Sequence, residues 1–156
     1  MVLFETMTLK HFNIPPFWTI FASFCAVVLH LLYPVVLLDM PLLAYGLITL
    51  SLVLLIWPGI WFRRYKTTIV PRQKPSTLMV GGPFTISRNP MYLGMVLLVL
   101  GTGVLLGSVQ ALLPAVWLFF FLGKNYITPE ERKLREAFDR EAEDYFARTG
   151  RWVWFL

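Results

Sequence analysis

Three stretches of this sequence contain no charged side chain over 22 residues or more, and they constrain the fold more than any other feature. They cover residues 17–38, 40–62 and 89–123. An α-helix of about 20 apolar residues crosses a hydrocarbon core ~30 Å thick. Charged residues make up only 15% of the 156 residues, too few to cover the surface of a soluble domain of this length. The sequence therefore predicts an all-α polytopic membrane protein.

The third stretch is too long for a single crossing. A straight helix over its 35 residues would measure ~52 Å at ~1.5 Å per residue. Two helices that turn near Gly107 and Ser108 fit better, if the second helix continues to Ile127. With residues 17–38 and 40–62, this hairpin gives four transmembrane helices.

The basic residues indicate how these helices are oriented. All 14 Lys and Arg residues lie in the N-terminal lead, in the loop 63–90, or from Lys124 onward. The positive-inside rule then places both termini in the cytoplasm. We expect one domain, residues 1–156, with two N-terminal spans (1–62), a cytoplasmic loop (63–90), a helical hairpin (91–127), and a cytoplasmic amphipathic helix with a membrane anchor (128–156).

Composition also disfavours several classes of function. The single cysteine, Cys25, excludes an internal disulfide. His11 and His30 lie far apart, without a neighbouring Cys or carboxylate at ligand spacing, so we predict no metal site. The net charge of +5 is explained by basic residues beside membrane spans, so we expect a lipid bilayer rather than a nucleic acid as partner. The oligomeric state is left open.

Polar motifs occur at the start and after the end of the third apolar stretch. The sequence GGPFTISRNPMYLG, residues 81–94, leads into that stretch, with Arg88 as its last charge and Pro90 suited to the first turn of a helix. Glu130 and Glu131 follow the stretch. A tight hairpin would return both glutamates to the same membrane surface as Arg88, so a cationic and an anionic cluster would meet there.

These motifs resemble the integral-membrane isoprenylcysteine carboxyl methyltransferases and their phospholipid N-methyltransferase relatives. The resemblance covers residues 75–152 and rests on the pattern Arg88-Asn89-Pro90-x-Tyr92-x-Gly94, the apolar hairpin, Glu130-Glu131 and Tyr145. Two positions depart from the family. Asn89 stands where the carboxyl methyltransferases usually have His, and Asp139 stands where many relatives have Gly.

The resemblance implies S-adenosylmethionine as cofactor and a membrane-embedded lipidic substrate. A carboxylate would hold the cofactor's ammonium group or hydroxyls, a guanidinium its carboxylate, and aromatic rings its adenine. The implied cofactor-binding residues are Gly82, Pro83, Arg88, Asn89, Pro90, Tyr92, Gly94, Gly101, Tyr126, Glu130 and Glu131; the implied catalytic residues are Arg88, Tyr145 and Arg151.

The implied reaction is transfer of a methyl group to the carboxylate of an isoprenylcysteine-like molecule. A phospholipid amine is the alternative acceptor, for which Tyr145 or a glutamate would take the proton. Arg88 or Arg151 would hold a substrate carboxylate. The active site would face the cytoplasm, in the inner membrane if the source is bacterial. A non-enzymatic membrane scaffold and a nicotinamide-dependent membrane reductase are the other readings.

Several local patterns allow two interpretations. Thr128, Pro129 and Glu131 could form a capping box at a helix start, or the glutamates could bind a ligand. Gly101 could allow close helix packing, or, on the cytoplasmic half of its helix, it could make room for a flat ligand between helices. Residues 151–155 could anchor the chain at the interface, or Arg151 could turn back towards the substrate.

Three further expectations concern single residues and pairs. His30 is expected to face a neighbouring helix, and Arg72 or Lys74 could lie near the cofactor. Residues 130–148 form a predicted charged helix that lies on the membrane or folds over the hairpin mouth. Its expected features are the ion pairs Glu131–Arg135 and Glu136–Arg140 and an apolar stripe of Leu134, Phe138 and Tyr145.

Overall fold

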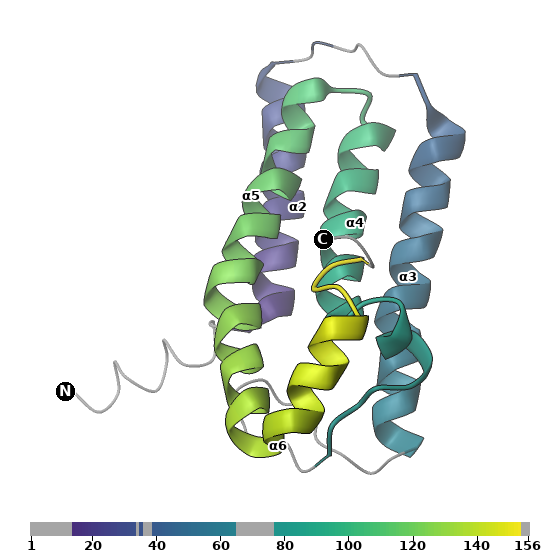
Figure 1. Ribbon diagram of the computed structural model, residues 1–156. Coiled ribbons are helices and arrows are strands. Elements are labelled where there is room, and N and C mark those ends of the chain that lie inside the picture. The colour runs from purple at the N-terminus through teal and green to yellow at the C-terminus, as the bar shows by residue number, and fades with distance from the viewer. Residues whose placement is uncertain (1–13, 34, 36–38, 65–76, 154–156) are drawn as a thin grey trace, which may run out of the picture.

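The computed structural model describes residues 14–33, 35, 39–64 and 77–153, and the regular structure in this part of the chain is helical throughout (Figure 1). The all-α expectation is confirmed. In chain order the elements are α2 (Pro15–Leu32), α3 (Pro41–Arg64), the 3-10 turn η1 (Gly82–Thr85), α4 (Pro90–Leu105), the 3-10 turn η2 (Val109–Leu112), α5 (Leu113–Leu122), the π-helical turn η3 (Gly123–Ile127) and α6 (Thr128–Arg148).

Helix α4 is the centre of the bundle, because it contacts α2, α3 and α5 (Figure 1). Within the described residues, three helical segments are long and apolar enough to cross a membrane: Pro15–Leu32, Pro41–Arg64 and Val109–Arg148. Helix α4 is apolar but has only 16 residues, or ~24 Å. A fourth crossing therefore stays a prediction, and it would need local thinning of the bilayer.

The first two helices differ at their ends from the predicted spans. Helix α2 ends at Leu32 rather than at residue 38, and Tyr33 already has non-helical backbone, with φ −134° and ψ 76°. A proline disfavours helical backbone at the residue before it, and residue 34 is proline. The end of the predicted span, residues 36–38, lies outside the described residues. Helix α3 continues through Pro58 to Arg64, although a proline inside a helix removes one backbone hydrogen bond.

The predicted hairpin turn is confirmed at Gly107 and Ser108. Gly107 has φ +71°, a conformation that favours glycine, between the end of α4 and η2. Ser108 is fully buried, and its hydroxyl is hydrogen-bonded to Nδ1 of His30 on α2. His30 therefore faces a neighbouring element, as expected of a polar group in an apolar helix.

Small residues allow α3 and α4 to approach closely. A Cβ atom on Gly101 would lie 2.8 Å from Ile48 Cγ1, and one on Gly94 would lie 3.1 Å from the Ser51 carbonyl oxygen. Such approach is how transmembrane helices gain van der Waals contact. The structure supports the packing interpretation of Gly101. It also corrects its position, because Gly101 lies in the half of α4 nearer the hairpin turn and not near the entrance at Pro90.

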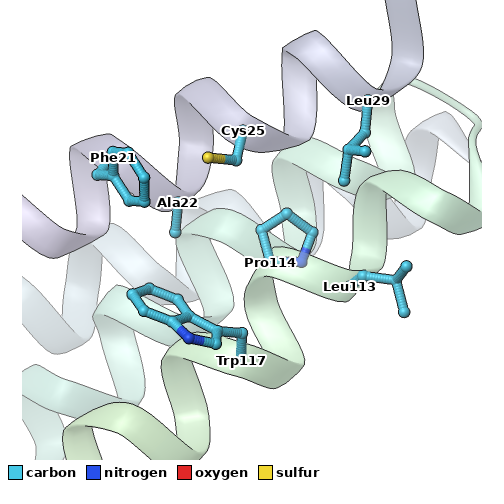
Figure 2. Close-up of a pocket in the computed structure, with 7 residues that line it drawn as sticks. All are labelled: Phe21, Ala22, Cys25, Leu29, Leu113, Pro114 and Trp117. Atoms are coloured by element: carbon cyan, nitrogen blue, oxygen red, sulfur yellow. The ribbon is translucent and has the colours of Figure 1, made fainter. Parts of the chain in front are cut away.

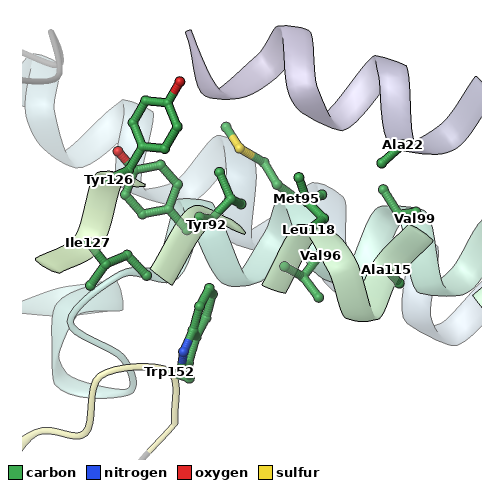
Figure 3. Packing of buried hydrophobic residues seen from close by; sticks show 11 residues of the cluster. Ala22, Tyr92, Met95, Val96, Val99, Ala115, Leu118, Tyr126, Ile127 and Trp152 are labelled. Atoms are coloured by element: carbon green, nitrogen blue, oxygen red, sulfur yellow. The ribbon is translucent and has the colours of Figure 1, made fainter. Parts of the chain in front are cut away.

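The apolar core lies between α2, α4 and α5 (Figure 3). Val99 of α4 and Leu118 and Leu122 of α5 are completely buried. At the Pro90 end of α4, this core also includes Tyr92, Tyr126 and Trp152. Aromatic and polar side chains therefore meet at one end of the bundle.

Helix α6 continues from α5 through η3 and then bends sharply at Asp139. The backbone at Asp139 has φ +42° and ψ −113°. We call residues 128–138 the first arm of α6 and residues 140–148 the second arm. The second arm folds back over the entrance of the hairpin (Figure 1).

The capping-box interpretation is wrong. The backbone is helical before Thr128, and the Thr128 hydroxyl donates a hydrogen bond to the Gly123 carbonyl at 2.9 Å instead of capping. A helix start was expected from the order of Thr128, Pro129 and Glu131, but the preceding helical turn already supplies carbonyl acceptors for the N–H groups that a cap would satisfy. Glu131 is thus available for another role.

Candidate active site at the hairpin entrance

The loop before α4 is fixed by its contact with α3. Gly82 has φ +60°, and a Cβ atom there would lie 2.9 Å from the Trp61 ring, so both conformation and space require glycine. Pro83 and Phe84 are buried, and Ser87 is completely buried. The backbone of residues 87–89 is therefore held beside the first turn of α4.

Residues 149–153, which we call the C-terminal strap, run along this loop. The backbone N–H of Arg88 donates to the Gly150 carbonyl at 3.0 Å, and Asn89 Nδ2 donates to the Arg151 carbonyl at 2.9 Å. The Ser87 hydroxyl also contacts the Arg151 carbonyl, at 3.4 Å. Trp152 is 5% exposed and stacks on Phe119 of α5 with ring centroids 4.4 Å apart. The strap is therefore tied to the entrance of the hairpin.

These elements bring Arg88, Glu131 and Arg151 together in what we call the arginine–glutamate cluster. Arg88 Nη1 lies 3.3 Å from Glu131 Oε1. Arg151 donates from Nε to Oε1 at 3.1 Å and from Nη2 to Oε2 at 2.6 Å. The Glu131 side chain is 4% exposed, against 13% for Arg88 and 39% for Arg151. Two guanidinium groups and one carboxylate leave a net positive charge at this buried point.

The pKa values of the two arginines are shifted in opposite directions. Burial lowers the pKa of the Arg88 guanidinium from its usual value of 12.5, and the Glu131 carboxylate opposes this shift. The hydrogen bond to Glu131 raises the pKa of Arg151, whose burial is smaller. Both stay charged near neutral pH, because arginine is not deprotonated in proteins. The cluster can therefore attract an anionic group.

A second carboxylate lies beside two aromatic rings. The Tyr92 hydroxyl donates to Glu130 Oε1 at 2.7 Å. The rings of Tyr92 and Tyr126 are 6.1 Å apart with an interplanar angle of 41°, and Tyr126 is 1% exposed (Figure 3). Tyr126 lies in the π-helical turn η3, a feature that is frequent at functional sites. Flat apolar surface thus adjoins a carboxylate.

Tyr145, on the second arm of α6, closes the site from another side. Its hydroxyl donates to the Phe84 carbonyl at 2.8 Å. Burial raises the pKa of Tyr145 above its usual value of 10, although the charge on Arg88 opposes this shift. A hydroxyl with this environment holds its proton, so Tyr145 is poorly suited to act as a general base.

The structure brings most of the predicted site residues to one place. Arg88, Asn89, Glu131 and Arg151 contact one another directly or through the strap. Tyr92, Tyr126 and Glu130 form a neighbouring group, Pro90 begins α4 beside Arg88, and Gly82 and Pro83 precede the carbonyl that Tyr145 contacts. Gly94 and Gly101 lie elsewhere, against α3.

Several sequence-level expectations are replaced by other contacts. Arg151 turns back to Glu131 and Trp152 is buried in the core, so the default expectation of an interfacial anchor is wrong for these two residues. The predicted pair Glu131–Arg135 is absent among the described ion pairs, because Glu131 binds Arg88 and Arg151. Residues 72 and 74 of the basic loop, and residues 154 and 155, lie outside the described residues.

The ion pairs of α6 also differ from the two that were predicted. Arg135 contacts Glu143 at 2.7 Å, and Glu136 lies 3.9 Å from Arg132 rather than beside Arg140. The first of these pairs joins the two arms of α6 and exists only because of the bend. The sequence analysis did not identify Ser87, Trp61, Phe146 or this pair as parts of the site. The only signal for any of them was the position of Ser87 next to Arg88 in a polar loop.

A separate apolar groove of about 230 Å³ lies between α2 and α5 (Figure 2). Its lining residues are Phe21, Ala22, Cys25, Leu29, Leu113, Pro114 and Trp117. No charged side chain lines the groove, so it does not suit an ionic cofactor. Within the described part of the chain, no group of three His, Cys, Asp or Glu side chains is placed to hold a metal ion.

Comparison with known proteins identifies the family of this chain. The sequence model of the phospholipid methyltransferase family matches residues 39–141, about two thirds of the chain. Neither the curated proteins nor the solved structures contain a significant match. The matched region includes α3, the Arg88 loop, the whole hairpin and Glu131. The chain therefore belongs to the phospholipid methyltransferase family.

Proposed function

We propose that this protein transfers a methyl group from S-adenosylmethionine to a lipid-borne acceptor at the entrance of the hairpin. The family is one of membrane methyltransferases. The observation that carries the proposal is the buried arginine–glutamate cluster, which lies between the start of α4 and the strap. A buried charge cluster of this kind, next to aromatic rings, is typical of a binding site for a small ionic molecule.

The residues present fit this cofactor. Arg88 would hold its carboxylate, since Nε of Arg88 is buried and has no hydrogen-bond partner among the described residues. Glu130 and Glu131 would bind its ammonium group and ribose hydroxyls, and Tyr92 and Tyr126 would contact its adenine. When bound, the sulfonium supplies an electrophilic methyl group. Arg151, the more exposed arginine, is the one with room to move from Glu131.

A carboxylate is the acceptor that the charges favour first. The net positive charge of the cluster attracts an anion, and an ionised carboxylate needs no base. Arg151 would orient it, since Arg88 holds the carboxylate of the cofactor. The buried entrance excludes water, which strengthens the attraction between the anionic acceptor and the sulfonium. An isoprenylcysteine-like molecule carries such a carboxylate on an apolar tail.

A phospholipid amine is the second candidate. The family description favours it, and so does Asn89, which stands where the carboxyl methyltransferases usually have His. An amine must lose a proton to react. Tyr145 is poorly suited to accept it, and Glu131 is engaged by two guanidinium groups, so Glu130 is the remaining candidate base.

The proposed setting is a single domain in a bilayer, with the active site and both termini on the cytoplasmic side. In a bacterium this is the inner membrane. The distribution of basic residues supports this orientation. The start of α2, the loop before α4 and the strap lie towards the same end of the bundle (Figure 1).

Proteoliposomes with isotopically labelled methyl donor test the proposal. One set contains an S-prenylated N-acylcysteine and the other phosphatidylethanolamine; the matched controls are the methyl ester of the first and phosphatidylcholine, which offer no free carboxylate or primary amine. Mass spectrometry then shows which lipid gains the label. We expect labelling of the prenylcysteine but not of its ester. Labelling of phosphatidylethanolamine alone would establish the second candidate.

If no lipid gains the label and the donor also fails to bind, the protein is not a methyltransferase. Thermal unfolding in detergent with S-adenosylhomocysteine or NADPH distinguishes the classes. Stabilisation by the first supports methyl transfer. Stabilisation by NADPH alone would indicate a reductase, and stabilisation by neither ligand would indicate a scaffold.

A further inference from the structure

Phe146 contacts two arginine side chains at once. It lies on the second arm of α6 and is partly buried. The Cζ atom of Arg88 lies 4.3 Å from the centroid of its ring, and that of Arg135 lies 4.8 Å from it. Both distances are well within the ~6 Å over which a guanidinium is attracted to an aromatic face.

The ring supplies a restraint on Arg88 that its hydrogen bonds do not. The Arg88 side chain contacts Glu131 through Nη1 at 3.3 Å, while Nε, although buried, has no hydrogen-bond partner among the described residues. One contact at one end of a planar group leaves it free to rotate. A ring face next to the guanidinium restricts this rotation.

Phe146 is itself held across the bend of α6. Arg135 belongs to the first arm and contacts the ring, and the same Arg135 pairs with Glu143 of the second arm at 2.7 Å. Phe146 and Glu143 are both on the second arm. The ring therefore links the Arg88 loop to both arms of α6, and none of these links is used by the proposed chemistry.

We propose that Phe146 is a positioning residue that holds the Arg88 guanidinium with its Nε edge available to the carboxylate of the methyl donor. This inference rests on the proposed function, and it identifies a determinant of donor affinity that does not itself touch the donor. Phe146→Leu removes the aromatic face but keeps an apolar side chain. Phe146→Trp keeps an aromatic face, and tryptophan is the strongest partner of cations.

The first test is donor affinity. We expect Phe146→Leu to weaken S-adenosylhomocysteine binding and to raise the KM for the donor by about fivefold to twentyfold. The kcat at saturating donor should stay within about twofold, since the variant removes an interaction that aids binding. Phe146→Trp should restore affinity. Phe138→Leu, a partly buried phenylalanine of the first arm, is the matched control and should bind like the wild type.

The second test is independent of activity. The Arg88 Nε–H signal in a ¹⁵N–¹H spectrum of the protein in detergent should carry a ring-current shift in the wild type and in Phe146→Trp. It should lose that shift in Phe146→Leu and keep it in Phe138→Leu. The proposal is overturned if Phe146→Leu binds the donor as the wild type does, or if the Arg88 signal does not respond.

The two proposals can fail separately. If the wild type binds S-adenosylhomocysteine but labels no acceptor, the proposed transfer fails, whereas the effect of Phe146→Leu on binding still supports the positioning role. If transfer occurs and Phe146→Leu leaves both KM and the Arg88 signal unchanged, only the positioning role is wrong.

Discussion

Asp139 is the position where a single substitution should most clearly improve this fold. Its φ of +42° and ψ of −113° lie near the values of the first central residue of a type II′ turn, the mirror image of about −60° and +120°. Glycine is strongly preferred there, because a Cβ atom clashes with the backbone.

The expected gain follows from two opposing terms. A residue held in a sparsely populated backbone region costs about 1–3 kcal/mol, which Asp139→Gly would remove. The extra freedom of glycine in the unfolded chain costs about 0.5–1 kcal/mol. Asp139 is exposed and forms no ion pair with a described residue, so no contact is lost. The net result is a stabilisation of up to about 2.5 kcal/mol, with a central value of about 1 kcal/mol.

The assay compares unfolding of wild type, Asp139→Gly and Asp139→Ala in one detergent, by heat and by denaturant. Asp139→Ala removes the same charge but keeps the Cβ atom, so it retains the backbone strain. We expect Asp139→Gly to be the most stable of the three. Equal stability of the Gly and Ala variants would refute the argument, because the effect would then come from charge alone.

Two other predictions concern stability. Folding raises the pKa of Tyr145 above its usual value of 10, so the protonated hydroxyl stabilises the fold below about pH 10 and this stabilisation is lost as the pH rises further. Unfolding measured at about pH 9 and pH 11 should show this loss of stability in the wild type but not in Tyr145→Phe. Gly101→Ala should destabilise the bundle by about 1 kcal/mol, because the added Cβ atom would press against Ile48. Gly46→Ala should not destabilise it, because the space beside Gly46 is open. Equal unfolding temperatures of the two variants would contradict this packing.

The hairpin could be predicted from the sequence because local rules determine it. An uncharged run of 35 residues cannot cross a bilayer once, and a glycine near its middle permits the turn. The return of Glu131 to the side of Arg88 follows from that geometry, and the structure places them 3.3 Å apart. The count of four spans does not follow in the same way, because α4 has only 16 residues.

The contacts of α6 could not be predicted, because they depend on the bend at Asp139. A straight helix pairs residues three or four apart, which gave Glu131–Arg135; the bend instead joins Arg135 to Glu143. The same bend sends the strap back to the loop before α4. For that reason Arg151 reaches Glu131. The sequence offered only a turn of Arg151 back towards the substrate, as the alternative to an interfacial anchor.

The most direct test of the central claim is calorimetric titration of S-adenosylhomocysteine into wild type, Glu131→Gln and Arg140→Gln. Arg140 is exposed on α6 and serves as the matched control. Charge-assisted hydrogen bonds contribute about 1.5–3 kcal/mol, so we expect Glu131→Gln to weaken binding by about tenfold to a hundredfold. Arg140→Gln should bind like the wild type. Unchanged affinity in a folded Glu131→Gln variant would contradict a donor site at the arginine–glutamate cluster.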